Sequence, residues 1–397
     1  MPSLLSILTS LAWPIAITIA WLVGEFGQRW TGLPRISFYG VAGFALASTQ
    51  LGVLPAPGTD DTMALLADVA FGLILFELGY RINLHWLRIN PWIGVAGLVE
   101  ALATFAAVYF VAVRFGTPQL TALMLAALSM ATSPATVVRV INEQASSGQV
   151  TERALHLSAL NCVLAVFAFN AVLGFWIFRT SEDLGDAIWS SLVVLVVSAL
   201  AGALLGVAVP ALLRAIGNVR QDATVAFALA VILLVAVTYT VRLSPVVATL
   251  AFGLAARHRR VAFSQAQRNF GALGEILTVL LFVFAASTLD WRKVVAGAAL
   301  ALTLVAARLV TKTVGVMLFA HLSGVSWRKG ALTGLALAPL SVFVIMLLEH
   351  ARHTGLRVVD ELLAMAAVTM LLEVFGPIII QRALVWAREA PEKSHAP

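Results

Sequence analysis

The sequence predicts an all-α polytopic membrane protein with about 13 transmembrane helices. Hydrophobic residues make up 60% of the 397 residues, and charged residues make up only 12%. Soluble domains carry roughly 25% charged residues, and a soluble chain of this length could not bury so much apolar surface. The mean hydropathy is +0.95, and the apolar residues form runs of the roughly 20 residues that cross a bilayer.

Thirteen such runs follow one another with short polar connections between them. The predicted spans cover residues 4–26, 35–54, 62–83, 91–114, 118–141, 153–178, 185–215, 222–241, 243–258, 270–290, 293–321, 327–350 and 360–387. The seventh span is long, which a tilt in the bilayer would accommodate, whereas the ninth is short and is either a separate span or part of the eighth. A short polar tail is expected over residues 389–397.

Basic residues predict the orientation of the chain. If the N-terminus lies outside, 17 of the 26 Lys and Arg residues fall in cytoplasmic segments, seven fall outside, and Arg308 and Lys312 fall inside a span. Cytoplasmic loops of membrane proteins carry this excess of positive charge. We therefore expect a multi-pass protein of a bacterial-type plasma (inner) membrane, with an external N-terminus and a cytoplasmic C-terminus. The same bias accounts for the net charge of +6, so no nucleic-acid partner is expected.

Two predicted spans contain a proline beside small polar residues. Pro134 follows Thr132 and Ser133 in the fifth span, and Pro339 precedes Ser341 in the twelfth. Proline removes one backbone donor and disfavours helical geometry at the residue before it. We therefore expect an unwound segment in each of these spans, and we expect the two segments to cross near the bilayer centre.

The two interruptions are seven spans apart, which predicts an internal repeat. Residues 1–180 and 219–388 would form two repeats of six spans, joined by one connecting span within 181–218. Because the connector crosses the membrane once, the second repeat is inverted relative to the first. Inverted repeats with crossed broken helices are typical of secondary transporters.

Ionisable side chains inside predicted spans are the first candidates for a functional site, because burying a charge in a bilayer costs several kcal/mol. Lys312 lies near the middle of the eleventh span, Glu100 lies in the fourth and Glu373 in the thirteenth. Each glutamate is either a proton carrier or a structural partner of Lys312 or Arg308. The lysine needs a carboxylate partner or must lose its proton.

Small polar residues near the first interruption are the second group of candidates. Asn161 and Cys162 lie in the sixth span, and Thr132 and Ser133 lie in the fifth. The oxygens of Thr132, Ser133 and Asn161 would bind an ion or cap the broken helix. Cys162 is either a small packing residue or a soft-metal ligand, but a soft site needs several ligands and this is the only cysteine. We expect no metal site, no cofactor and no enzymatic activity.

Five segments resemble the monovalent cation:proton antiporter superfamily, of the sodium/proton and potassium-efflux antiporter type. They are Leu73–Gly79, Thr132–Glu143, Thr151–Ala165, Leu243–Gly253 and Thr311–Gly315, which resemble its third helix, first broken helix, sixth helix, short re-entry into the second half and lysine-bearing helix. The resemblance covers most of the chain. It implies a homodimer with a fixed dimerisation and scaffold domain and a mobile core domain, which carries the ion site and moves like an elevator.

The sequence departs from the pattern of this family at two ionisable positions. Members that transport cations usually carry Asn-Asp or Asp-Asp where this chain has Asn161 and Cys162. The second broken helix often carries Pro-Arg-Gly-Glu, whereas this chain continues from Pro339 with leucine, serine and valine. A carboxylate that binds ion and proton in turn is therefore absent from its usual place.

These observations leave three functional hypotheses open. The first is exchange of a monovalent cation, sodium or potassium, for protons, with Glu373 or Glu100 in place of the missing aspartate. The second is a transport-inactive member of the fold that acts as a sensor or partner subunit. The third is transport of another substrate, such as an anion attracted by Lys312 and Arg139.

Overall fold

The computed structural model describes residues 4–56, 61–177, 184–216, 219–258, 270–340, 342–345, 347–348 and 363–390. Within these ranges the chain forms helices and no strand. The helices are α1 (Leu4–Thr31), α2 (Arg35–Leu46), α3 (Asp61–Arg81), α4 (Leu84–Ile89), α5 (Pro91–Arg114), α6 (Gln119–Met130), α7 (Pro134–Glu143), α8 (Gln149–Ile177), α9 (Leu184–Ile216), α10 (Val219–Thr240), α11 (Pro245–His258), α13 (Gly271–Ser287), α14 (Trp291–Leu318), α15 (Trp327–Ala336) and α17 (Leu363–Trp386).

Nine stretches of the described chain are long and apolar enough to cross a membrane, which confirms a multi-pass membrane protein. One of these stretches contains both α6 and α7. The other four predicted spans correspond to the shorter helices α2, α11, α13 and α15. The total of thirteen crossings stays a prediction.

Two local features differ from the predicted spans. Helix α2 ends at Leu46, eight residues early, and the chain turns back so that the Leu54 N–H donates to the Leu46 carbonyl over 2.9 Å. Gly52 has a φ of +70°, which glycine adopts without steric cost and which this turn requires. The short helix α4 was not expected. Its N-cap is Asn83, whose side-chain oxygen accepts hydrogen bonds from the N–H groups of His85 and Trp86.

The first residue of the predicted polar tail is buried against the bundle. Glu389 is buried, and its carboxylate accepts hydrogen bonds of 2.8 Å from the Val150 and Thr151 N–H groups at the start of α8. A carboxylate at this end of a helix binds free backbone donors and offsets the positive end of the helix dipole. The end of the described chain is thereby fixed to α8, and residues 391–397 lie outside the described ranges.

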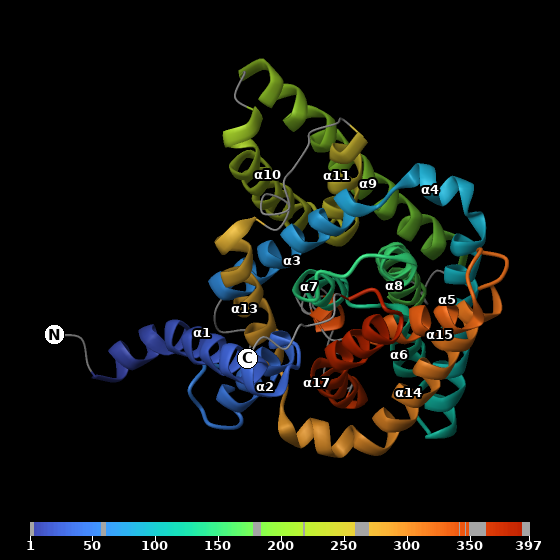
Figure 1. Ribbon diagram of the computed structural model, residues 1–397. Helices are drawn as coiled ribbons and strands as arrows, with labels where there is room; N and C mark the ends of the chain where they lie inside the picture. Colours follow the sequence, from blue (N-terminus) through green and yellow to red (C-terminus); the bar gives the residue numbers. More distant parts are fainter. Residues whose placement is uncertain are drawn as a thin grey trace.

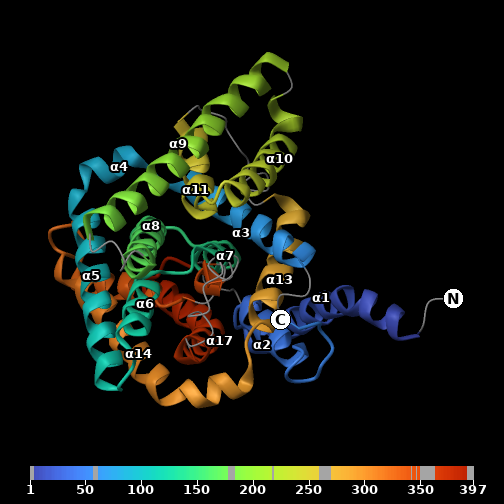
Figure 2. The ribbon, with the colours of Figure 1, turned by 180° about the vertical axis from the view of Figure 1, so that it is seen from behind.

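The helices other than α3 and α4 pack in three groups. Helices α5, α6, α7, α8, α14, α15 and α17 form one bundle, and α9, α10 and α11 extend from the other side of α3 (Figure 1). Helices α1, α2 and α13 pack together beside this bundle, where α17 contacts α2 (Figure 2). The bundle contains both interruptions, and α8 and α14 lie against them.

The two interruptions touch each other inside the bundle. The chain is not helical over residues 131–133, between α6 and α7, or over residues 338–340, after α15. The Ser133 N–H donates to the Pro339 carbonyl over 2.8 Å, and the Thr132 hydroxyl donates to the Leu337 carbonyl over 3.2 Å. Pro134 is the first residue of α7, so its helix begins rather than bends there. The second unwound segment was expected to extend from Ala338 to Ser341, and Ser341 lies outside the described residues.

Helix α14 approaches α5 closely at Gly315, and this contact yields a prediction. A Cβ atom at Gly315 would lie 2.6 Å from the Glu100 Cβ and 2.9 Å from its Cα. We expect Gly315→Ala to lower the melting temperature, because the helices must separate at a cost of about 1–3 kcal/mol. Gly94→Ala is the matched control on α5, since no atom lies within 4 Å of its added Cβ. Equal melting temperatures of the two variants in detergent would contradict this packing.

Candidate functional site

Helix α14 carries two cationic side chains into the bundle. Arg308 and Lys312 are four residues apart, which places them on the same face one turn from each other. The exposed fraction is 1% for Arg308 and 0% for Lys312. The Asp290 side chain caps the start of α14 by accepting a hydrogen bond of 2.9 Å from the Arg292 N–H. Helix α14 therefore places both positively charged side chains next to the interruptions.

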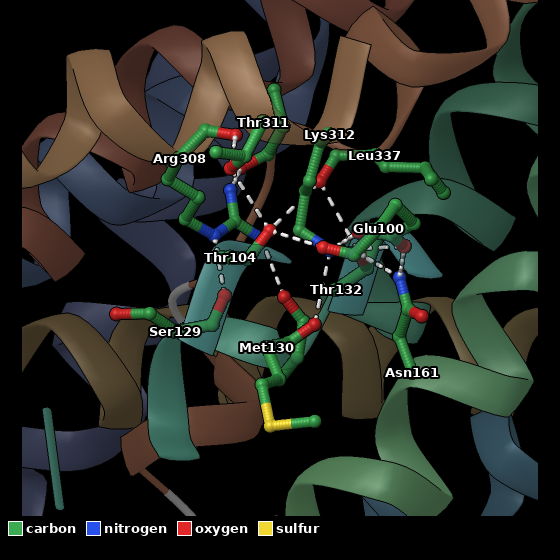
Figure 3. A network of polar contacts seen from close by, with 12 residues as sticks. Glu100, Thr104, Ser129, Met130, Thr132, Asn161, Arg308, Thr311, Lys312 and Leu337 are labelled. Atoms are coloured by element: carbon green, nitrogen blue, oxygen red, sulfur yellow. Dashed lines mark hydrogen bonds and ion pairs between the residues drawn. The ribbon is translucent and has the colours of Figure 1, made fainter. Parts of the chain in front are cut away.

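The Arg308 guanidinium binds backbone carbonyls of both interruptions (Figure 3). Its Nε donates to the Ser129 carbonyl over 3.0 Å. Its terminal nitrogens donate to the carbonyls of Ala131, Leu337, Ala338 and Pro339. Arg308 thus ties the end of α6 to the end of α15.

These carbonyls need a cationic partner for a physical reason. The last four carbonyls of a helix have no partner within that helix, and they form the negative end of its dipole. In a bilayer no water is available to satisfy them, so broken helices persist only where other groups do so. Here α6 and α15 end side by side, and Arg308 and Lys312 supply both hydrogen-bond donors and opposite charge.

Lys312 joins the end of α6 to a buried carboxylate. Its Nζ lies 3.0 Å from Glu100 Oε2 and 3.3 Å from Oε1, and it donates to the Met130 carbonyl over 3.0 Å. Glu100 and Lys312 are both fully buried. Near this pair, the hydroxyls of Thr104 and Thr311 lie 3.0 Å apart, which joins α5 to α14 a second time. The interaction predicted for Lys312 is therefore present, and its partner is Glu100.

Asn161 on α8 completes this cluster. Its side-chain Nδ2 donates to a Glu100 carboxylate oxygen, and also to the Thr132 hydroxyl over 3.2 Å. Asn161 is fully buried, yet its Oδ1 has no hydrogen-bond partner among the described residues. Most buried acceptors are satisfied. An unsatisfied amide oxygen beside a carboxylate is the kind of ligand that a small cation would bind.

Cys162 lies beside this cluster, but its thiol contacts a backbone carbonyl and not Glu100 or Lys312. It is fully buried, and its thiol lies 3.3 Å from the Thr132 carbonyl. Ser133 acts as the N-cap of α7, with its hydroxyl accepting from the Thr136 N–H. No group of three or more His, Cys, Asp or Glu side chains in the described chain is arranged to hold a metal ion.

Glu373 occupies a different position. It lies on α17 with 2% of its surface exposed, and it packs against Gly40 of α2. A Cβ atom at Gly40 would lie 2.4 Å from the Glu373 Cγ, so only glycine permits this approach. The hydrogen bonds around Lys312 involve Glu100 and not Glu373. Of the two predicted carboxylates, Glu100 is the one in contact with Asn161 and Lys312.

Sequence reasoning brought together most of this cluster but missed parts of it. Thr132, Asn161, Lys312 and Glu100 meet in one network (Figure 3). A pair of Arg308 with a buried glutamate was one of the alternatives that the sequence left open, whereas Arg308 binds backbone carbonyls at both interruptions. The sequence did offer one indication of its position, because a spacing of four residues places Arg308 on the same helix face as Lys312. The sequence could not identify the Met130 carbonyl as a partner of Lys312, because every residue has a backbone carbonyl.

Comparisons with known proteins agree with this architecture. The family model described as sodium/hydrogen exchanger, transmembrane, matches residues 15–386. A comparison with curated protein sequences finds no match.

Two solved structures of the sodium proton antiporter MjNhaP1 from Methanocaldococcus jannaschii are also similar. The structure at pH 8 has a TM-score of 0.67 at 15% identity and covers 94% of this chain and 95% of that chain. The structure described as a three-dimensional electron-microscopy map has a TM-score of 0.74 at 14% identity, with both chains covered completely. At such identities the likeness shows a shared fold.

The buried pair predicts a specific pattern in a double-mutant cycle. Lys312→Met should destabilise the protein by about 3–5 kcal/mol, because it leaves Glu100 as a buried charge without its cation. Adding Glu100→Gln should restore most of the loss, because the double variant buries no unpaired charge. Thermal unfolding in detergent measures all four proteins. Additive losses in the double variant would mean that the two side chains do not interact.

Proposed function

We propose that this chain, which belongs to the sodium/hydrogen exchanger family, exchanges a monovalent cation, sodium or potassium, for protons across the membrane. The observation that carries this proposal is the buried cluster of Glu100, Lys312 and Asn161 at the contact of the two interruptions. A cation site in a bilayer needs a carboxylate and neutral oxygens shielded from lipid. Glu100 supplies the carboxylate that the sequence lacks at Cys162.

The exchange follows from charge balance in this cluster. While Lys312 is protonated, its ammonium neutralises Glu100 and no further cation is attracted. When a cation binds Glu100, Lys312 gives up one proton to the aqueous side and remains as a neutral amine. The net charge of the cluster is then unchanged, so the cation and the proton occupy it in turn.

The remaining ligands would come from neutral groups. Asn161 Oδ1 has no hydrogen-bond partner among the described residues and lies in the side chain that contacts Glu100. The Thr132 hydroxyl adjoins the same amide. The carbonyls that bind Arg308 are already occupied, so they are not offered to the cation. Cys162 is assigned a neutral packing role.

The architecture expected from the sequence is part of the same proposal. Residues 1–180 and 219–388 would be inverted repeats joined within 181–218, with a core domain that moves against a scaffold and a homodimer as the assembly. The paired interruptions of α6–α7 and α15 and the single long helix α9 support this arrangement. We place the protein in a bacterial-type inner membrane with its N-terminus outside.

A transport-inactive sensor or partner subunit is the second candidate function. The observation in its favour is the thiol of Cys162, which stands where cation-transporting relatives usually have an aspartate. Transport of an anion is not proposed. Lys312 is paired with Glu100 over 3.0 Å, and Arg139 lies 3.9 Å from Glu77, so both candidate anion ligands face a carboxylate.

Proton flux in proteoliposomes tests the proposal. We expect dye-reported flux that depends on sodium or potassium, and Glu100→Gln should abolish it because no carboxylate remains to hold the cation. Glu373→Gln should reduce flux far less, and Cys162→Ser should be mild, since neither side chain touches the Glu100–Lys312 pair. If Glu100→Gln retains full flux, the assignment of the site is wrong. If the unmodified protein shows no flux with sodium, potassium or lithium, the transport-inactive candidate is favoured.

Accessibility labelling tests the proposed orientation. In a Cys162→Ser background, Ser3→Cys should react with an impermeant thiol reagent from outside intact cells, and Ser394→Cys should react only after the membrane is opened. The reason is the excess of basic residues in the segments assigned to the cytoplasm. Labelling of both positions from one side would contradict the odd number of crossings and the inverted repeats.

A further inference from the structure

The connection between α3 and α5 is held by a histidine of α8. Residues 82–90 leave the end of α3, form α4 and enter α5 (Figure 1). The Asn83 N–H donates to His156 Nε2 over 3.0 Å. His156 lies five residues before Asn161 on α8, and 5% of its surface is exposed. The connection is therefore fixed directly to the helix that carries the candidate ion ligand.

The hydrogen bonds of His156 define its protonation state. Its Nδ1 lies 2.7 Å from the Glu152 carbonyl, and a carbonyl only accepts, so Nδ1 carries a hydrogen. Its Nε2 accepts from the Asn83 N–H, so Nε2 carries none. This is a neutral imidazole. An imidazolium carries hydrogens on both nitrogens, and its Nε2–H would face the Asn83 N–H with no acceptor between them.

Ring contacts strengthen the same attachment. The Trp86 ring centroid lies 4.7 Å from that of His156, and the Arg153 guanidinium lies 5.6 Å from the Trp86 centroid. On the other side, Arg257 of α11 donates to the carbonyls of Tyr80 and Arg81 at the end of α3. Helix α11 therefore holds the end of α3 just before the connection, and α8 holds the connection itself at Asn83.

The charged groups around His156 act in opposite directions. Glu152, on the preceding turn of α8, attracts a positive charge on the ring, whereas Arg257 of α11 repels it. Arg153 is directed toward Trp86 and the Ser323 carbonyl. On α4, His85 and Arg88 are exposed to solvent. Burial of the ring is the strongest influence on its protonation and opposes the positive charge, Arg257 adds to this opposition, and Glu152 acts against it.

We propose that His156 is a positioning residue that fastens the α3–α5 connection to α8 only while its imidazole is neutral. The connection joins α3, which packs on α11, to α5, which packs on α8 and α14. A movement of the bundle relative to α3 and α11 must change the shape of this connection, because it links the two directly. Protonation of His156 removes the acceptor for Asn83 and frees residues 82–90, so cytoplasmic acid eases the movement that carries Asn161. This transport consequence rests on the proposed exchange function.

Hydrogen–deuterium exchange tests the attachment without requiring transport. In the purified wild-type protein, the amides of residues 82–90 should lose at least tenfold protection, after correction for the intrinsic rate, as the pH falls from about 8 to about 4. The range extends below that of a free histidine because burial opposes the imidazolium. His156→Gln keeps an oxygen that accepts from Asn83 but does not titrate, so its protection should stay constant. His85→Gln, on the exposed face of α4, should behave as the wild type. If His156→Gln loses protection as the wild type does, the proposal is overturned.

Flux measurements test the consequence for transport. Relative to the wild type, His156→Gln should show a several-fold smaller rise in proton-coupled flux when the side assigned to the cytoplasm is acidified, with normal flux at pH 8. Identical pH profiles of the two proteins would overturn the transport consequence. If the wild-type protein shows no flux with any cation but its hydrogen–deuterium exchange changes with pH as expected, the proposed function is refuted and the attachment by His156 still holds.

Discussion

The structure depends on how the carbonyls at two broken helices are satisfied. Helices α6 and α15 end inside the bundle, where lipid and protein offer no water to their last carbonyls. Arg308 and Lys312 of α14 bind these carbonyls and place positive charge at two negative helix ends. Without these two side chains the interruptions would expose unsatisfied backbone groups. The position of α14 is therefore fixed by the same contacts that form the candidate site.

This arrangement also places a carboxylate beside the interruptions without an aspartate at position 162. Three positions define the local charge: Arg308 is balanced by helix ends, and Lys312 is balanced by Glu100. A carboxylate at Cys162 would add a negative charge to a cluster that is already compensated. The buried carboxylate beside Lys312 belongs to α5, where Gly315 lets the backbone of α14 approach Glu100. Asn161 of α8 contacts the same carboxylate.

The cluster and the α3–α5 connection share one helix. Asn161 contacts Glu100 from α8, and His156 on the same helix accepts from Asn83. A displacement of α8 therefore changes the ion ligands and the attachment of the connection together. At the start of α8, the Glu389 carboxylate binds two backbone N–H groups, so the helix is also tied to the end of α17. These contacts make α8 the element through which movement and binding would be coupled.

The sequence by itself determined the membrane class, the apolar helices and the two interruptions, because hydropathy and proline chemistry act locally. It also identified Lys312, Glu100, Asn161 and Thr132 as unusual side chains for a bilayer. Only the tertiary structure decided that Glu100 rather than Glu373 faces Lys312, and that Arg308 binds carbonyls instead of an acid. The partner of a side chain in a helix bundle depends on packing between helices that are distant in sequence. The residue pattern within one span does not indicate which neighbouring helix each of its faces contacts.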